Sequence, residues 1–274
     1  MSPSKNSVNK KLAVISGSGG LPLKVSENAF KQGWDGIIIN LTDLNINKIR
    51  PNWNVFNIKI GKVSQIFKRL HIEKVTHIVL CGGIERPKLQ EIKFDLKGLD
   101  IMSKIAFKGD DAALRVLSLE IEKEGFIISS ASDFLDNSLV PKGHYAGPKP
   151  LESISREIER GYNVLVNLSQ SDVGQSVAVQ NGLVLAVEAI EGTDLMLKRV
   201  QSLKLPGIGP ILVKAPKVNQ DLRFDQPVIG IQTVKNAIKS GFSCIACKHN
   251  EVLIVDIGKV IRLANSKSLT LIGF

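Results

Sequence analysis

The amino-acid sequence predicts an α/β protein of two domains, the first built on a doubly wound sheet of parallel strands and the second of mixed α/β type. Three observations lead to this expectation. Short apolar runs alternate with amphipathic, helix-length segments up to about residue 128, a pattern typical of parallel sheets. Proline and glycine then cluster over residues 136–150, and short β-rich runs become frequent after residue 175. A chain of 274 residues is long enough for both domains.

The first domain opens with a strand, a glycine-rich loop and a helix that ends at Gly33. A run of three isoleucines then indicates a buried second strand, and an amphipathic helix leads to a third strand. The expected elements are strands over residues 12–15, 36–41 and 75–81 and helices over residues 23–32 and 62–70. Gly82 and Gly83 follow the third strand, at the edge where ligands of such sheets tend to bind.

Two more elements and a linker complete the first half. Apolar spacing predicts a helix over residues 112–124 with Asp110 as its N-cap, followed by a short strand over residues 126–128. The three prolines and two glycines of residues 136–150 predict a linker. The resulting division is a first domain over residues 1–135, a linker over residues 136–150 and a second domain over residues 151–274.

The second domain contains more strand-like runs than the first. Asn181 and Gly182 between two such runs predict a tight hairpin turn. The order of the strands in the sheet does not follow from the sequence. The expected strands cover residues 176–179, 183–189, 211–214, 228–230 and 252–255, and the expected helices cover residues 151–160, 193–200 and 234–240.

Composition and charge narrow the class of protein. No apolar run approaches the roughly 18 residues that a membrane-spanning helix needs, and three cysteines argue against a disulfide framework. We therefore expect a cytoplasmic protein. Most of the +10 formal charge lies in residues 1–150 and favours anionic partners, although solvated surface lysines explain it equally well. Aromatic residues make up only 5% of the chain, which argues against nucleic acid as a partner.

The loop after the first strand is a candidate phosphate site. Gly17, Ser18, Gly19 and Gly20 precede a helix, and helix N-termini favour anions. The loop lacks the glycine spacing of the dinucleotide fingerprint and the lysine of a P-loop. Asn40, rather than an acidic residue, ends the second strand where ribose is usually held. These departures disfavour a nicotinamide-dependent oxidoreductase, and a structural turn without a ligand remains an alternative.

A second candidate segment lies at the start of a later helix. Lys108, Gly109, Asp110 and Asp111 place one cation and two carboxylates there. Such a set suits a network of sugar hydroxyls or a metal-linked phosphate. A helix cap explains one aspartate but not both together with the lysine, although acidic residues are favourable in any first helical turn.

Two charged clusters stand out in the second half. Glu188, Glu191, Thr193 and Asp194 lie between a strand and a helix, and residues 214–227 form a proline-bracketed loop after another strand. Phosphoryl chemistry needs cations for the phosphate oxygens and a carboxylate that holds a metal ion or orients water. Oxygen ligands favour Mg²⁺. The charged side chains of the loop are those of Lys214, Lys217, Asp221, Arg223 and Asp225.

Other kinds of catalytic site find little support. The four histidines share no metal-ligand spacing, and the zinc signature H-E-x-x-H and the serine-hydrolase elbow G-x-S-x-G are both absent from the sequence. Cys244 and Cys247 have the spacing of a redox motif but stand in an apolar, strand-like stretch. We expect them to pack in the core.

The sequence resembles the LpxI-type UDP-2,3-diacylglucosamine pyrophosphatases of lipid A biosynthesis, over nearly its whole length. The blocks that carry the resemblance are residues 17–22, Arg86 with Pro87, and residues 108–114, 172–175, 187–194 and 214–227. The resemblance implies a Rossmann-like first domain and an active site between the two domains. It also implies Mg²⁺-dependent hydrolysis of UDP-2,3-diacylglucosamine to UMP and 2,3-diacylglucosamine 1-phosphate (lipid X).

The resemblance also assigns roles to residues. Asp225 corresponds to the essential aspartate, as a catalytic group or a metal ligand, and Glu188 and Glu191 are further candidate ligands for Mg²⁺. Gly83 stands where a polar side chain is expected, so that one hydrogen bond to the substrate is missing or mediated by water. The candidate substrate-binding residues are Gly17, Ser18, Gly19, Gly20, Arg86, Lys108, Gly109, Asp110, Asp111, Gln175, Thr193, Asp194, Lys214, Lys217, Gln220 and Arg223.

The implied substrate is a membrane lipid, so we expect peripheral contact with the cytoplasmic side of the inner membrane, through the basic first half. A homodimer is an open possibility for the assembly. A non-catalytic sensor of nucleotide sugars or lipids is the alternative function; it predicts tight binding of the product and no phosphate-bond cleavage.

Overall fold

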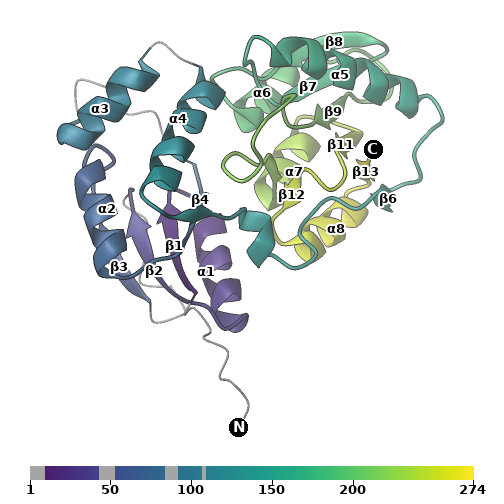
Figure 1. Ribbon diagram of the computed structural model, residues 1–274. Coiled ribbons are helices and arrows are strands. Elements are labelled where there is room, and N and C mark those ends of the chain that lie inside the picture. Colours follow the sequence, from purple (N-terminus) through teal and green to yellow (C-terminus); the bar gives the residue numbers. More distant parts are fainter. Residues whose placement is uncertain (1–9, 43–52, 84–91, 107–108) are drawn as a thin grey trace. The chain divides into compact units, whose positions relative to one another are not determined.

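The computed structural model of the protein describes residues 10–42, 53–83, 92–106 and 109–274 (Figure 1). It divides into two compact units. Unit 1 comprises Met1–Asp136 together with Arg223–Asp225, and unit 2 comprises Asn137–Leu222 and Gln226–Phe274. The predicted α/β architecture in two parts is therefore confirmed, but unit 1 takes three residues from the second half of the chain.

Unit 1 is built on a five-stranded sheet whose neighbouring strands are all parallel, in the order β3-β2-β1-β4-β5. The predicted strands are present, and one more, β3, was not predicted because its sequence Asn-Val-Phe-Asn is short and half polar. The strands are β1 (Lys11–Ser16), β2 (Asp35–Asn40), β3 (Asn54–Asn57), β4 (His77–Cys81) and β5 (Ile127–Ile128).

Helices cover both faces of this sheet. On one face α1 packs against β1 and β2, and on the other α2 and α4 contribute Ile66, Phe67, Leu70 and Ile121 to the core. The helix α3 was not predicted; its N-cap Asp95 accepts a hydrogen bond from the backbone N–H of Gly98. The helices are α1 (Leu21–Lys31), α2 (Val63–Ile72), α3 (Leu96–Ile105), α4 (Asp110–Lys123) and the 3₁₀ helix η3 (Ala131–Phe134).

The helix α4 begins at Asp110, two residues before the predicted start at residue 112. Asp110 is the first residue of the helix, and the N-cap is Gly109, whose backbone is extended at φ −66° and ψ 169°. The N-cap residue is the last one with non-helical dihedral angles. The prediction that Asp110 caps α4 was therefore wrong, because Asp110 and Asp111, which precede the apolar residues, already belong to the first turn of the helix.

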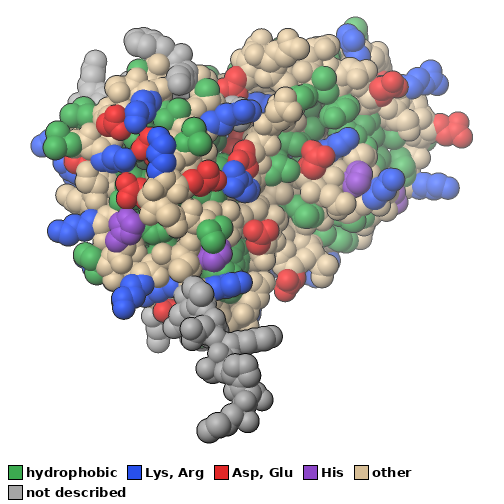
Figure 2. All heavy atoms as spheres, in the orientation of Figure 1, with side chains coloured by type: hydrophobic (Ala, Val, Ile, Leu, Met, Phe, Trp, Pro, Cys, Tyr) green, Lys and Arg blue, Asp and Glu red, His purple; other side chains and the backbone are tan. Residues whose placement is uncertain are grey.

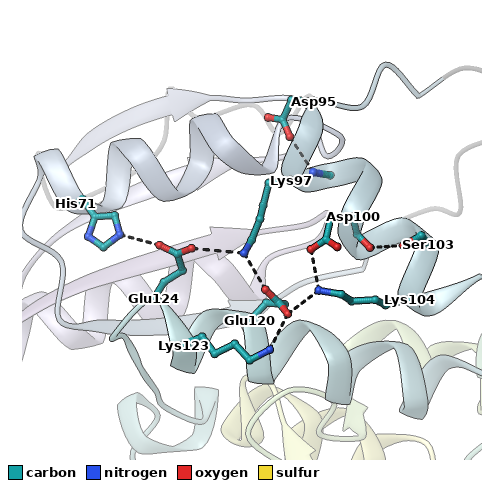
Figure 3. Close-up of polar contacts among 10 residues, drawn as sticks. His71, Asp95, Lys97, Asp100, Ser103, Lys104, Glu120, Lys123 and Glu124 are labelled. Atoms are coloured by element: carbon teal, nitrogen blue, oxygen red, sulfur yellow. Dashed lines mark hydrogen bonds and ion pairs between the residues drawn. The ribbon is translucent and has the colours of Figure 1, made fainter.

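A cluster of ion pairs joins α3 to α4 (Figure 3). The carboxylate of Glu120 on α4 is only 4% exposed and contacts the amino groups of Lys97 at 2.8 Å, Lys104 at 3.1 Å and Lys123 at 3.1 Å. Lys97 also lies 3.6 Å from Glu124, which contacts His71 on α2. Hydrogen bonds from Lys97, Lys123 and Lys104 lower the pKa of Glu120 to about 2. This cluster fixes α3 through charge as well as through packing.

Unit 2 contains a mixed six-stranded sheet in the order β6-β13-β11-β9-β7-β8. The strands β9, β11 and β13 are parallel to one another, whereas β7 runs antiparallel to both β9 and β8, and β6 runs antiparallel to β13. A separate parallel pair is formed by β10 (Val228–Ile229) and β12 (Leu253–Ile254). The large sheet consists of β6 (Gly143–Ala146), β7 (Ser176–Gln180), β8 (Leu183–Val187), β9 (Ile211–Lys214), β11 (Cys244–Cys247) and β13 (Thr270–Gly273).

Four helices cover the two faces of this sheet. One face packs against α5, and the other forms a larger core with α6, α7 and α8. Positive φ angles at Asn181 and Gly182 confirm the predicted hairpin turn. The helices are α5 (Ile154–Ser169), α6 (Thr193–Val200), α7 (Ile231–Lys239) and α8 (Ile257–Ser266), of which α8 was not predicted.

Residues 137–150, which the sequence analysis assigned to a linker, are part of unit 2. Val140 is fully buried in its core, and β6 pairs with β13. Prolines and glycines occur here because β6 is a short edge strand between turns, where missing N–H donors are tolerated.

The two cysteines of the apparent redox motif are core residues, as predicted. Cys244 packs on the α5 face of the sheet and Cys247 on the opposite face. Burial raises the pKa of both thiols, that of Cys247 to about 12. Among the described residues, no helix combines the length and the apolar character needed to cross a bilayer.

Candidate active site

One edge of the unit 2 sheet gathers polar residues from three strands. Lys214 is the last residue of β9, and it pairs with Ser176, the first residue of the antiparallel strand β7. Glu188 follows β8 and donates its backbone N–H to the carbonyl oxygen of Ser176 at 2.9 Å. Because β9 runs opposite to β7, the end of one strand meets the start of the other. Residues far apart in the sequence therefore lie together at this edge.

Lys214 is a buried cation within this group. The residue is only 4% exposed, and its amino group donates to the hydroxyl of Thr193 at 2.7 Å and to that of Ser176 at 3.2 Å. The Thr193 hydroxyl in turn donates to Glu188 Oε2 at 2.9 Å. Lys214 Nζ lies 3.9 Å from the same carboxylate oxygen. A buried ammonium held by hydroxyl groups, with a carboxylate nearby, is suited to binding an anion.

The other two carboxylates of the acidic cluster differ from Glu188 and from each other. Glu191 forms an ion pair with Arg199 at 2.5 Å. Hydrogen bonds from its own backbone N–H, and then from Arg199 and the Ala189 N–H, hold the pKa of Glu191 below its ordinary value. Asp194, in the first turn of α6, has a buried Oδ1 for which the described part of the chain provides no hydrogen-bond donor. Asp194 is thus the more suitable of the two to accept a cation or a donor from a ligand.

An ion pair and hydrogen bonds fix the loop after β9, and Lys217, Gln220 and Gln175, which take part in them, were predicted to bind the substrate. Lys217 forms an ion pair with Asp172, and its backbone N–H donates to Gln220 Oε1 at 2.7 Å. The carbonyl oxygen of Gln175 accepts a hydrogen bond from the N–H of Ala215 at 3.0 Å. Gln220 therefore shapes the loop, and Gln175 contributes a backbone contact beside Lys214.

In the glycine-rich loop of unit 1, the first two residues make close backbone contacts, whereas the last two have free space beside them. A Cβ atom on Gly17 would come within 2.4 Å of the carbonyl oxygen of Gly83. Both the backbone N–H and the hydroxyl of Ser18 donate to that same oxygen, at 2.6 and 2.8 Å. A Cβ atom on Gly19 or Gly20, which precede α1, would have no neighbour within 4 Å. Within residues 17–20, and as far as the described residues show, these last two offer open backbone to a ligand.

The hydrogen bonds of Asn40, the last residue of β2, argue against a nicotinamide-dependent oxidoreductase. Asn40 is buried, and its side chain donates to Asn57 Oδ1 at 2.7 Å and accepts from the Ser16 hydroxyl at 3.4 Å. The amide that stands at the usual ribose position is thus used to join the ends of three strands.

The segment Arg223–Asp225 belongs to unit 1. Arg223 donates to Glu122 Oε1 at 3.1 Å, and Phe224 packs against the unit 1 core. Asp225 is half-buried in this segment, whereas Asp221, four residues earlier, is part of unit 2. The structure thereby distinguishes two aspartates that spacing alone could not separate.

Several predicted site residues lie outside what the structure describes. Arg86 and Lys108 are outside the described residues, and the side chains of Asp110 and Asp111 are also outside them, although both residues are in α4. Gly109 is exposed at the N-cap of that helix.

The described residues contain no group of three or more His, Cys, Asp and Glu side chains close enough to hold a metal ion. Mg²⁺ commonly uses only one or two carboxylates, together with water and substrate phosphates. Among the described residues the Oδ1 atom of Asp194 has no donor, so it can serve as such a ligand. Glu188, six residues earlier, accepts a hydrogen bond from Thr193 and is a second carboxylate of the same cluster. The donor set of unit 2 is therefore compatible with Mg²⁺.

Ser176 is the residue that sequence reasoning missed. It is fully buried and contacts both Lys214 and Thr193. Its position at the start of a predicted strand was visible in the sequence, but the pairing of that strand with β9 was not.

Comparison with known proteins identifies the family. The sequence profile of the LpxI N-terminal domain matches residues 11–138, and that of the LpxI C-terminal domain matches residues 141–272. A relative from Caulobacter vibrioides, named UDP-2,3-diacylglucosamine pyrophosphatase LpxI, is 32% identical over 273 residues, which cover 96% of this chain and 97% of the relative.

Solved structures resemble the chain only slightly. One is a dehydrogenase named Cj0485, at 12% identity and a TM-score of 0.27 over 43% of this chain and 47% of its own. Another is N5-carboxyaminoimidazole ribonucleotide synthetase from Thermotoga maritima, at 18% identity and a TM-score of 0.23 over 66% of this chain and 42% of its own. Likenesses this slight carry no argument. The two domain profiles and the full-length relative do, and the chain belongs to the LpxI family.

Proposed function

We propose that this chain hydrolyses the diphosphate of UDP-2,3-diacylglucosamine, releasing UMP and 2,3-diacylglucosamine 1-phosphate, in lipid A biosynthesis. The observation that carries this proposal is the similarity to a UDP-2,3-diacylglucosamine pyrophosphatase over nearly the full length of both chains. The buried cation at the edge of the unit 2 sheet supplies the chemistry that the reaction needs, because Lys214 is held by hydroxyl groups beside a carboxylate.

The proposed roles follow from charge. Lys214 stabilises negative charge on the diphosphate as the bond to the leaving phosphate breaks. Lys217, whose amino group is paired with Asp172, adds to the positive charge of the same loop to a lesser degree. Asp225 orients or deprotonates the attacking water, or holds the metal ion. Asp194 and Glu188 would hold Mg²⁺, which when bound neutralises phosphate oxygens. Glu191 has a lesser part in metal binding in this proposal, because Arg199 already neutralises it.

Product analysis tests the proposal directly. The protein is incubated with UDP-2,3-diacylglucosamine in the presence of Mg²⁺ or of EDTA, and UMP and the lipid product are separated and quantified. Release of both products with Mg²⁺ and none with EDTA is the expected result. Tight binding of the substrate without release of UMP would refute hydrolysis and would instead support the sensor function.

We further propose that the protein contacts the cytoplasmic side of the inner membrane peripherally, where its lipid substrate resides. Charged side chains of both signs and scattered apolar ones cover the visible face of unit 1 (Figure 2). On α3, Leu96 is 85% exposed and Leu99 is also exposed. Lys93, three residues before Leu96, is exposed as well. Exposed leucines near a lysine suit a surface of anionic lipid.

Sedimentation with vesicles tests this membrane contact. We expect more protein to sediment with anionic than with neutral vesicles, and less after replacing Leu96 and Leu99 by serine. Equal sedimentation with both kinds of vesicle would contradict the proposal.

A further inference from the structure

The hydrogen bonds around Lys214 run in a single direction. An ammonium group only donates, a carboxylate only accepts, and a hydroxyl group donates one hydrogen. The Thr193 hydroxyl donates its hydrogen to Glu188 Oε2. Its contact with the Ser176 hydroxyl, 3.1 Å away, must therefore use the hydrogen of Ser176. Ser176 in turn accepts from Lys214, so the chain runs from Lys214 through Ser176 and Thr193 to Glu188.

This arrangement leaves one N–H of Lys214 without an acceptor among the described residues. Two of its three N–H groups are used by the hydroxyls of Ser176 and Thr193. Glu188 Oε2, at 3.9 Å, is beyond hydrogen-bond distance and already accepts from Thr193. A buried donor without an acceptor is unfavourable, so an oxygen from outside the protein is expected to complete the site.

We propose that Ser176 is a positioning residue that holds the Lys214 ammonium with its third N–H directed at a phosphoryl oxygen of the substrate. This inference rests on the proposed function. A lysine ammonium rotates freely on a flexible stem, so it points in one direction only where acceptors fix its other N–H groups. Ser176 is fully buried at the start of β7 and cannot itself touch the substrate. It acts through Lys214.

A purely structural role is the competing explanation. Ser176 lies within the sheet, and removing its hydroxyl could simply loosen β7. The two explanations differ in what the mutation changes: a structural role lowers stability and leaves the turnover of the folded protein intact, whereas a positioning role lowers kcat with little effect on KM.

The first experiment measures kcat and KM for UMP release by Ser176→Ala. Since misplacing a catalytic group by about 1 Å costs on the order of 100-fold, we expect kcat to fall by about 10- to 100-fold, with KM changed by less than about threefold. Ser243→Ala is the matched control, because the Ser243 hydroxyl donates to the carbonyl of Gly209 at 2.6 Å, at the opposite end of the same sheet. Its kcat should match that of the wild type. An unchanged kcat in folded Ser176→Ala would overturn the inference.

A double-mutant comparison tests whether Ser176 acts through Lys214. Ser176→Ala should lower the residual turnover of Lys214→Met no further, because the group that it positions is gone. Equal effects in both backgrounds would overturn the inference. Ser176→Cys keeps a side chain of similar size with a weaker acceptor, and it should also lower kcat. This variant takes the place of Ser176→Ala in the kinetic experiment if the alanine variant does not fold.

Calorimetry with UMP separates failure of this inference from failure of the proposed function. If the wild type releases no UMP from the substrate, the proposed reaction is wrong, but an anion can still be held by Lys214. UMP should then bind to the wild type, bind about two- to threefold more weakly to Ser176→Ala, and bind no more weakly to the double variant Ser176→Ala, Lys214→Met than to Lys214→Met alone. Equal binding by the wild type and Ser176→Ala, or no binding by the wild type, would overturn the inference.

Discussion

Replacing Glu120 by glutamine tests the ion-pair cluster that joins α3 to α4. The pKa of Glu120 is lowered from 4.5 to about 2, and at about 1.4 kcal/mol per pKa unit this sets an upper limit of about 3 kcal/mol on its contribution. The amino group of Lys123 is on a side chain that is 67% exposed, so solvent screens part of the attraction. We expect Glu120→Gln to lower the free energy of unfolding by about 1–2 kcal/mol at pH 7.

The lowered pKa of Glu120 also predicts how its contribution to the free energy of unfolding changes with pH. Because the folded-state pKa of Glu120 is depressed, its contribution is fully present above about pH 4.5 and is lost as the pH falls towards 2. The difference between wild type and Glu120→Gln should therefore shrink to less than half at pH 3.

Urea unfolding followed by tryptophan fluorescence measures the effect. Both tryptophans, Trp34 and Trp53, lie in unit 1, so the signal reports the unit that contains the cluster. Glu27→Gln on α1 is the control, because Glu27 has no ion-pair partner among the described residues, and it should leave stability within about 0.5 kcal/mol of the wild type. Equal stability of Glu120→Gln and wild type at pH 7, or the same difference at pH 3 as at pH 7, would refute the reasoning.

Three further outcomes are expected. Asp225→Ala should fold normally and lose at least about 100-fold in turnover, as for a catalytic base or metal ligand; near-normal release of UMP would remove the assignment. Gly17→Ala should destabilise unit 1 by about 2 kcal/mol or more, because its Cβ would meet the Gly83 carbonyl oxygen at 2.4 Å, whereas Gly20→Ala should be tolerated in thermal unfolding. The three buried thiols, whose pKa values burial raises, should not react with a thiol reagent at pH 8 until urea unfolds the protein.

Elements with a clear apolar pattern were predictable from the sequence. The helix α6 and the strand β9 begin and end at the predicted residues, because each has a clear apolar pattern that starts directly after a glycine or a proline, Gly192 and Pro210. The strands β3, β6 and β13 were missed. Polar residues and glycine interrupt the apolar pattern of β3 and β6, and only pairing with a neighbour makes them strands. In β13 only Leu271 and Ile272 are apolar, and its place in the sheet depends on pairing with β11 and β6.

The candidate site was predictable in its parts and not in its assembly. Spacing identified the acidic cluster and the loop that begins at Lys214. It could not show that Ser176, 38 residues before Lys214, meets it across two antiparallel strands. Nor could it show that Asp225 belongs to unit 1 while Asp221 belongs to unit 2. Both facts depend on long-range pairing, which local sequence does not encode.

The discontinuity of unit 1 has a consequence for folding during synthesis. Residues up to Asp136 leave the ribosome first, but Phe224, which packs against the core of unit 1, is made only after all of Asn137–Leu222. The N-terminal part of the chain must therefore wait with part of its apolar surface uncovered while most of unit 2 is translated. A fragment that ends at Asp136 would keep that surface permanently open, so the domain boundary read from the sequence profiles is a poor place to cut the gene.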